Sequence, residues 1–193
     1  MTLSQRIDDI DDVDGPEIGQ ASRWASAYGA DRLHAWRECP NGVWLIVLAI
    51  ALDVELLRAL CAAADCVEVF LLELNSPELL GSLKLAKHVF EAGRESADED
   101  SLNEALDVAL ADANAFLEQA GDASDPSNAG GWAVHYLLSA ARSGYNAHRS
   151  AVWASAAALR GLIALGSSAE SAAMRTADIV RKRITSAHLR QNA

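Results

Sequence analysis

Ten consecutive apolar residues, VWLIVLAIAL at positions 43–52, are the strongest constraint on the fold of this 193-residue chain. A helix that spans a membrane needs about 20 largely apolar residues, so the run is too short to span one. Pro40 is expected to end the preceding helix, and Asn41 is a candidate N-cap for the next. A short helix that is apolar on every side is buried by its neighbours. The run therefore predicts the central helix of a soluble helical bundle.

Helix-start patterns recur along the rest of the chain. Asp53 and Ser76 are candidate N-caps, and Pro77 would occupy a first helical position, where its missing N–H is harmless. The segments SLNE at 101–104 and SSAE at 167–170 match the capping box. No segment shows a convincing alternation of period two, which a half-buried strand requires. The predicted fold class is all-α, a compact multi-helix bundle of about seven or eight helices with an Ala-rich C-terminal helical part.

Composition divides the chain into four parts. Residues 1–16 are an acidic N-terminal tail, and the sequence leaves open whether this tail is ordered. Residues 17–120 are predicted to form an acidic helical core. Residues 121–131, GDASDPSNAGG, are the best candidate for a linker. Residues 132–193 are Ala-rich and basic, and we expect them to pack on the core because Ala favours helices and lets their axes approach closely.

Charge is distributed unevenly between the two ends of the sequence. Residues 1–125 carry 25 acidic and 8 basic side chains, a net charge of −17. Residues 126–193 carry 2 acidic and 8 basic side chains, a net charge of +6. Phosphate repulsion argues against nucleic acid as a ligand of so acidic a chain. A basic protein partner, or a second copy of the chain, is electrostatically compatible with the acidic part.

Compartment is inferred from the N-terminus and the cysteines. The first residues, MTLSQRIDDIDDVDGPE, are acidic and lack the basic-then-apolar order of a signal peptide. The three cysteines Cys39, Cys61 and Cys66 are an odd number without zinc-ribbon spacing, which suits a reducing compartment. We therefore expect a cytoplasmic protein with no membrane partner.

The sequence contains no pattern that indicates catalysis, a cofactor or a metal site. Cys61 and Cys66 are five positions apart in one predicted helix, about 140° around its axis, so they cannot bind one metal together. They are predicted to be buried free thiols, whereas Cys39 is expected to be more accessible. The histidines form neither Glu-x-x-His nor His-Glu-x-x-His. The sequence therefore predicts no catalytic residue, no cofactor and no metal ligand.

Two kinds of side chain are candidates for binding a protein partner. Acidic clusters offer charge, and tryptophans in the Ala-rich part are either interface anchors or core residues. The candidate partner-binding residues are Asp8, Asp9, Asp11, Asp12, Asp98, Glu99, Asp100, Trp132 and Trp153. The alternative interpretation is that the acidic clusters are merely solvated. Three further tryptophans near the apolar run are predicted to fill the core: Trp24, Trp36 and Trp44.

Three segments between residues 33 and 95, about a third of the chain, carry a family resemblance. They are AWRECPNGVWLIVLAIAL, LLRALCAAADCVEVFLLEL and PELLGSLKLAKHVFEAG. This part resembles bacterial all-helical immunity proteins of polymorphic toxin systems. The matching positions are Ala35, Trp36, Cys39, Trp44, Leu45, Leu48, Ala49, Asp65, Cys66 and Pro77. Val43 replaces an acid that is usual in the family, and Phe90 lies near the place of a second Trp-Ala. The resemblance implies a binding protein that neutralises a toxin, not an enzyme.

Three functions follow from these observations. The first is a non-enzymatic helical protein-binding module, an immunity protein that neutralises a basic toxin with its acidic part. The second is a self-assembling structural subunit, in which residues 126–193 of one copy meet the acidic part of the next and form rings or filaments. The third is a helical small-molecule enzyme or sensor, which requires Asp65, His88 and His135 to converge on a polar cavity.

Overall fold

The computed structural model describes residues 1–10, 15–92, 99–144 and 146–189. These residues form ten α-helices and one short 3₁₀ helix, and no strand is found among them. The predicted all-α class is confirmed, but the predicted count of seven or eight helices is wrong. The additional helices are short: α1 has 6 residues and α3 has 7. Helices of fewer than two turns are too short to show a periodic apolar pattern in the sequence.

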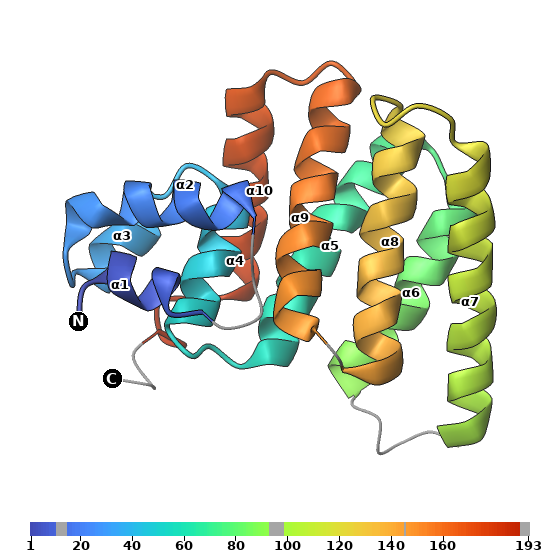
Figure 1. The fold of residues 1–193 in the computed structure, drawn as a ribbon, viewed down its shortest axis with the longest axis horizontal. Coiled ribbons are helices and arrows are strands. Elements are labelled where there is room, and N and C mark those ends of the chain that lie inside the picture. Colours follow the sequence, from blue (N-terminus) through green and yellow to red (C-terminus); the bar gives the residue numbers. More distant parts are fainter. Residues whose placement is uncertain (11–14, 93–98, 145, 190–193) are drawn as a thin grey trace.

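The first helices form one end of the molecule (Figure 1). They are α1 (Leu3–Asp8), α2 (Pro16–Ala25), the 3₁₀ helix η1 (Ser26–Tyr28), α3 (Arg32–Glu38) and α4 (Gly42–Ala51). In α1, Leu3 and Ile7 are buried, and this helix packs on α2 and α4. The first part of the expected acidic tail is therefore a docked helix, because two apolar side chains four positions apart share one face.

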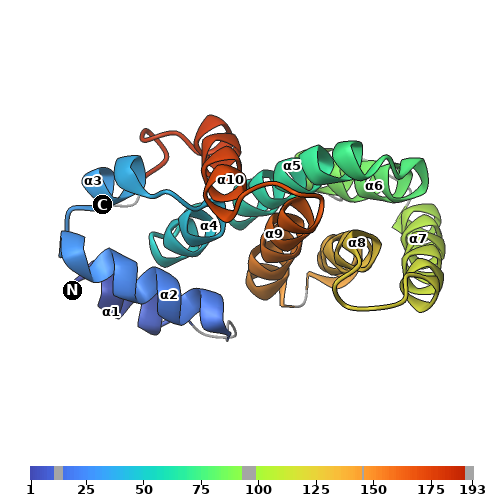
Figure 2. The same ribbon diagram turned by 90° about the horizontal axis from the view of Figure 1, so that it is seen from above.

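The remaining helices make up the larger part of the fold. They are α5 (Leu56–Leu74), α6 (Pro77–Ala92), α7 (Glu99–Gln119), α8 (Pro126–Ser143), α9 (Ala147–Ala164) and α10 (Ala169–Arg183). Figures 1 and 2 show α7, α8 and α9 side by side, with α5 and α6 behind them. Helix α8 packs on α6, α7 and α9, and α9 packs on α5. Helix α7 lies at the end of the molecule opposite α1 and α3, so one side of it faces outward.

The apolar run forms the buried helix that the sequence predicts. Among the ten residues of α4, only Trp44 is partly exposed. The Asn41 side chain caps this helix, accepting a hydrogen bond from the Val43 N–H over 2.9 Å. Helix α4 packs on α2, α9 and α10. Its start lies so close to α10 that a Cβ on Gly42 would be 2.5 Å from the carbonyl carbon of Thr176. Each fully buried Leu, Ile or Val of such a helix contributes roughly 1.5–3 kcal/mol.

Several predicted helix starts are displaced in the structure. Asp53 is not an N-cap, since it has a φ of 56° and α5 begins at Leu56. Helix α7 begins before Ser101, so that serine lies inside the helix. The cap of α10 is Ser168, which accepts a hydrogen bond from the Ser171 N–H. Local capping patterns favour a start but do not fix it, because packing decides how far a helix extends.

Helix α6 and the predicted linker show how local patterns and packing combine. Helix α6 begins at Pro77 as predicted, although the Ser76 hydroxyl makes no hydrogen bond in the described part of the chain. The linker is shorter than predicted, because α8 begins at Pro126 and is capped by the Asp125 side chain. Gly130 lies inside α8 at a place of close packing, where an added Cβ would be 3.0 Å from Leu74 Cδ2.

Candidate protein-binding surface

Arginines of the basic part form ion pairs with carboxylates of the acidic part. Arg142 binds Asp107 with both ends of its guanidinium, at 2.8 and 3.3 Å. Further such pairs among the described residues include Arg160–Glu17, Arg175–Glu73, Arg183–Asp65 and Arg183–Glu91. Part of the charge difference between the basic and acidic parts is therefore neutralised by ion pairs within the fold. Solvent screens exposed pairs of this kind, so they orient helices more than they stabilise them.

The most buried of these ion pairs joins α5, α6 and α10. Asp65 accepts two hydrogen bonds from Arg183, at 2.8 and 3.0 Å, and lies 2.9 Å from the Lys87 ammonium. Lys87 also donates to Glu68 over 2.6 Å. Burial acts to raise the pKa of Asp65, but the hydrogen bonds from Arg183 and Lys87 outweigh it and lower the pKa. Asp65 is therefore an ionised structural residue that docks α10 on the core.

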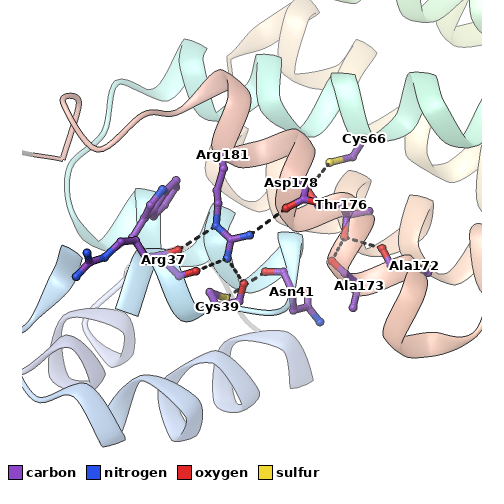
Figure 3. A network of polar contacts seen from close by, with 10 residues as sticks. Arg37, Cys39, Asn41, Cys66, Ala172, Ala173, Thr176, Asp178 and Arg181 are labelled. Atoms are coloured by element: carbon purple, nitrogen blue, oxygen red, sulfur yellow. Dashed lines mark hydrogen bonds and ion pairs between the residues drawn. The ribbon is translucent and has the colours of Figure 1, made fainter. Parts of the chain in front are cut away.

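All three cysteines are buried free thiols. This confirms the prediction for Cys61 and Cys66, whereas the greater accessibility expected of Cys39 is wrong, since its exposed fraction is 0%. Burial raises the pKa of Cys39 to about 12 and raises the pKa of Cys66 as well. Thiols with raised pKa values are poor nucleophiles at neutral pH. The Cys66 thiol donates instead to the carbonyl of Thr176, as Figure 3 shows.

Arg181 of α10 binds the C-terminal end of α3 (Figure 3). Its guanidinium donates hydrogen bonds to the backbone carbonyl oxygens of Trp36, Arg37 and Cys39. These carbonyls belong to the last turn of a helix, where the backbone itself provides no partner. The contact is structural, because it satisfies backbone oxygens and joins α10 to the first helices.

The three residues of the enzyme or sensor hypothesis have different surroundings. Asp65 lies between Arg183 and Lys87, whereas the His135 ring lies 5.6 Å from the Trp132 ring. Burial lowers the pKa of His135. His88 is exposed on α6. In the described part of the chain, no group of three or more His, Cys, Asp or Glu residues is arranged to bind a metal ion.

The outward side of α7 is acidic. Its residues 99–119 include six acidic side chains and not one Lys or Arg. Those that are exposed and form no ion pair with any described residue are Asp100, Glu104, Asp112 and Glu118, whereas Glu99 interacts electrostatically with Arg142. Val108, 57% exposed, lies between them. The structure thus collects unpaired negative charge on a helix at the end of the molecule (Figure 2).

The other predicted acidic residues do not join this surface. Asp8 and Asp9 are exposed at the end of α1, on the side of the molecule opposite α7 (Figure 1). Asp11, Asp12 and Asp98 lie outside the described residues. The described acidic residues of the predicted set therefore lie in two separate places: Asp8 and Asp9 at the end of α1, and Glu99 and Asp100 on α7.

The tryptophans divide between core and surface. Trp36 is buried, and Trp24 and Trp44 are partly buried against the core. Trp132 on α8 is not a core residue, since it is 41% exposed. Trp153 on α9 is partly buried.

Trp132 forms one wall of a groove between α8 and α9, about 580 Å³ in volume. Its ring stacks on Tyr136 at 5.6 Å, and Arg160 and Ile163 line the same groove. Trp, Tyr and Arg are the residue types most enriched where protein interfaces concentrate their binding energy.

Sequence reasoning missed much of both surfaces, although signals were present. Trp132 and Tyr136 are four positions apart, which places them on one helix face. The absence of Lys and Arg from the 21-residue stretch 99–119 is also visible in the sequence. By contrast, Arg160 and Ile163 reach the groove only because α9 packs beside α8.

No helix in the described part of the chain is both long enough and apolar enough to cross a membrane. In comparisons with known proteins, no family model, no curated protein and no solved structure matches this chain.

Proposed function

We propose that this protein is a non-enzymatic helical module that binds a basic protein partner through the outward side of α7. The observation that carries the proposal is the charge of that helix: six acidic and no basic residues on an element at the end of the fold. Oppositely charged surfaces steer partners together and fix their orientation. Four exposed acids of α7 are available for this role, because among the described residues they form no ion pair: Asp100, Glu104, Asp112 and Glu118.

Apolar groups next to the acidic surface support a protein as the partner. Val108 is exposed in the middle of α7, and the groove with Trp132 and Tyr136 lies on the neighbouring helix α8. Protein interfaces combine apolar and aromatic anchors with a polar rim. Nucleic acid has the wrong charge for this surface, since its phosphates would be repelled.

The specific form that we propose is a cytoplasmic immunity protein that covers the active surface of a toxin. The resemblance of residues 33–95 to that family suggests the role, and the acidic side of α7 suggests the chemistry. A toxin that acts on nucleic acid must offer a basic surface to phosphate. Such a surface is complementary to α7, and binding there would exclude the substrate. The buried free thiols Cys39, Cys61 and Cys66 suit a reducing compartment.

The test uses the product of the gene next to the one that encodes this protein. Binding of the two purified proteins is measured by calorimetry at low and at physiological salt. Because exposed charges are screened over about 8 Å at physiological ionic strength, affinity should fall as salt is added. The double variant Glu104→Lys/Glu118→Lys should weaken binding by about tenfold or more.

The matched control places the same change of charge at the other end of the molecule. The variant Asp8→Lys/Asp9→Lys should bind as the parent protein does. Binding that is indifferent to salt, or that weakens only when Asp8 and Asp9 are changed, would contradict the role of α7. If the neighbouring gene product is not basic and does not bind, the proposal that this protein is an immunity protein is contradicted.

A further inference from the structure

A groove of about 620 Å³ runs between the start of α6 and the last turns of α7. Its apolar lining residues include Leu79, Ala113 and the partly exposed Phe116, and the polar residues Ser82 and Gln119 line it as well. Two exposed acidic residues also line it, Glu78 from α6 and Asp112 from α7. The groove therefore combines apolar surface with negative charge contributed by two helices.

The charge of this groove is not balanced from within the described part of the chain. Neither Glu78 nor Asp112 has an ion-pair partner there, and none of the described residues lining the groove is a Lys or Arg. Elsewhere in the fold, acidic residues do have partners: Asp107, on the same helix as Asp112, is bound by Arg142. The two groove carboxylates thus remain available to a cation from outside.

The shape of the groove restricts what that cation can be. A small hydrated ion would leave the apolar lining of the groove uncovered. Arginine and lysine side chains have an aliphatic stem that covers apolar surface and a charged head that stays near water. The planar guanidinium of arginine also has five donors, enough to bind two carboxylates at once. An arginine side chain therefore complements both the apolar lining and the two carboxylates of the groove.

We propose that this groove is the anchor site for one arginine side chain of the basic partner. Its stem lies on Phe116, and its guanidinium binds Glu78 and Asp112. The inference rests on the proposed function for the identity of the partner, and it adds a defined contact to the general charge of α7. It also distinguishes these two carboxylates from the other acids of the helix.

The test uses butylguanidinium as a probe of an arginine side chain and butylurea as its neutral counterpart of similar shape. Each is titrated into the protein while backbone amide shifts are recorded by NMR. Butylguanidinium should give saturable shifts at the amides around Asp112, Ala113 and Phe116. Butylurea should bind roughly tenfold more weakly, because it lacks the charge that the carboxylates attract.

Two variants with the same loss of charge complete the test. Glu78→Gln/Asp112→Asn should abolish saturable binding of butylguanidinium, whereas Glu99→Gln/Glu104→Gln, which changes α7 away from the groove, should leave it within twofold of the parent. Both pairs change exposed side chains, and a thermal melt confirms that each variant folds.

Several outcomes would overturn the anchor site. They are equal binding of butylurea, shifts centred on another surface, and equal losses in both variants. These outcomes would not contradict the proposal that α7 attracts a basic partner by its general charge, because the binding experiment with the partner tests that proposal separately. Saturable binding of butylguanidinium without any binding of the basic partner would support the anchor site and contradict the proposed function.

Discussion

The Nε of Arg181 in α10 donates a hydrogen bond to the carbonyl oxygen of Trp36, 3.2 Å away, across 145 positions of sequence. The same guanidinium reaches the carbonyl of Arg37 over 2.9 Å and that of Cys39. One side chain thus satisfies the end of α3 from the last helix of the fold (Figure 3).

Replacing Arg181 should therefore destabilise the protein. Arg181→Ala leaves carbonyls of the α3 terminus without their donors, and the expected loss is about 1–3 kcal/mol in the free energy of unfolding. Arg181→Lys keeps the charge but not the fork of donors, so its loss should be smaller yet measurable. Urea denaturation followed by circular dichroism gives both values. The neighbouring exposed Lys182→Ala is the control, and an equal loss there would refute the role of Arg181.

The partly buried carboxylate Asp65 should make stability depend on acid pH. Its folded pKa is lowered, so its contribution is present in full above the unfolded pKa of about 4 and is lost as pH falls through the folded pKa. Asp65→Asn should cost roughly 1–3 kcal/mol at pH 7, less than the loss of a fully buried partner. The difference between parent and variant should shrink below about pH 4. Denaturation curves at a series of pH values measure it, and a difference independent of pH would contradict the assignment.

Gly161 in α9 is required for close packing on α5. A Cβ at this position would overlap the ring of Phe70, which is fully buried. Gly161→Ala should destabilise the protein by about 1–3 kcal/mol, because an overfilled core must shift. Gly81→Ala in α6 is the matched control, since a Cβ there meets open space and alanine should stabilise the helix by about 0.5–1 kcal/mol. Thermal melts of both variants test the contrast, and equal effects would disprove it.

Trp132 should affect binding more than folding. Because its side chain is 41% exposed, Trp132→Ala should cost only about 1 kcal/mol of stability, largely the stacking on Tyr136. The same change should weaken the partner complex by about tenfold, as expected of an interface anchor. Leu72→Ala, which removes another exposed apolar side chain, is the control for binding. If both variants bind the partner equally well, the α8–α9 groove is not part of the interface.

The protein should be monomeric at low and at high salt. Arginines that the self-assembly hypothesis assigns to a second copy are engaged within the chain, with Arg160 bound to Glu17 and Arg183 to Asp65. Size-exclusion chromatography with light scattering measures the mass directly. Assembly at low salt that dissolves at high salt would favour the structural-subunit hypothesis over the binding module.

The sequence predicted the core of the fold because its strongest signals are local. The apolar run and the cap at Asn41 identify α4 without any knowledge of its neighbours. Gly130 and Gly131 were assigned to a linker, since adjacent glycines usually mark loops. In the structure they lie where α8 approaches Leu74 and Leu117. Contacts between residues so distant in sequence cannot be predicted from one sequence alone.

The candidate surface was predictable only in part, because it too depends on contacts between residues distant in sequence. Glu99, Asp100 and Trp132 were identified from their type and neighbours in sequence. The groove between Glu78 and Asp112 was not, because its two walls come from different helices. The uneven charge was visible in the sequence, but only tertiary contacts show which acidic residues are already paired.

The contact of α10 with α3 and α4 also affects how the chain is made. A ribosome releases the protein from its N-terminus, so residues 1–41 emerge long before α10 is translated. Until then the end of α3 lacks its donor, and the start of α4 lacks the helix that covers Gly42. The end of α3 and the start of α4 therefore reach their final contacts only after α10 has been made.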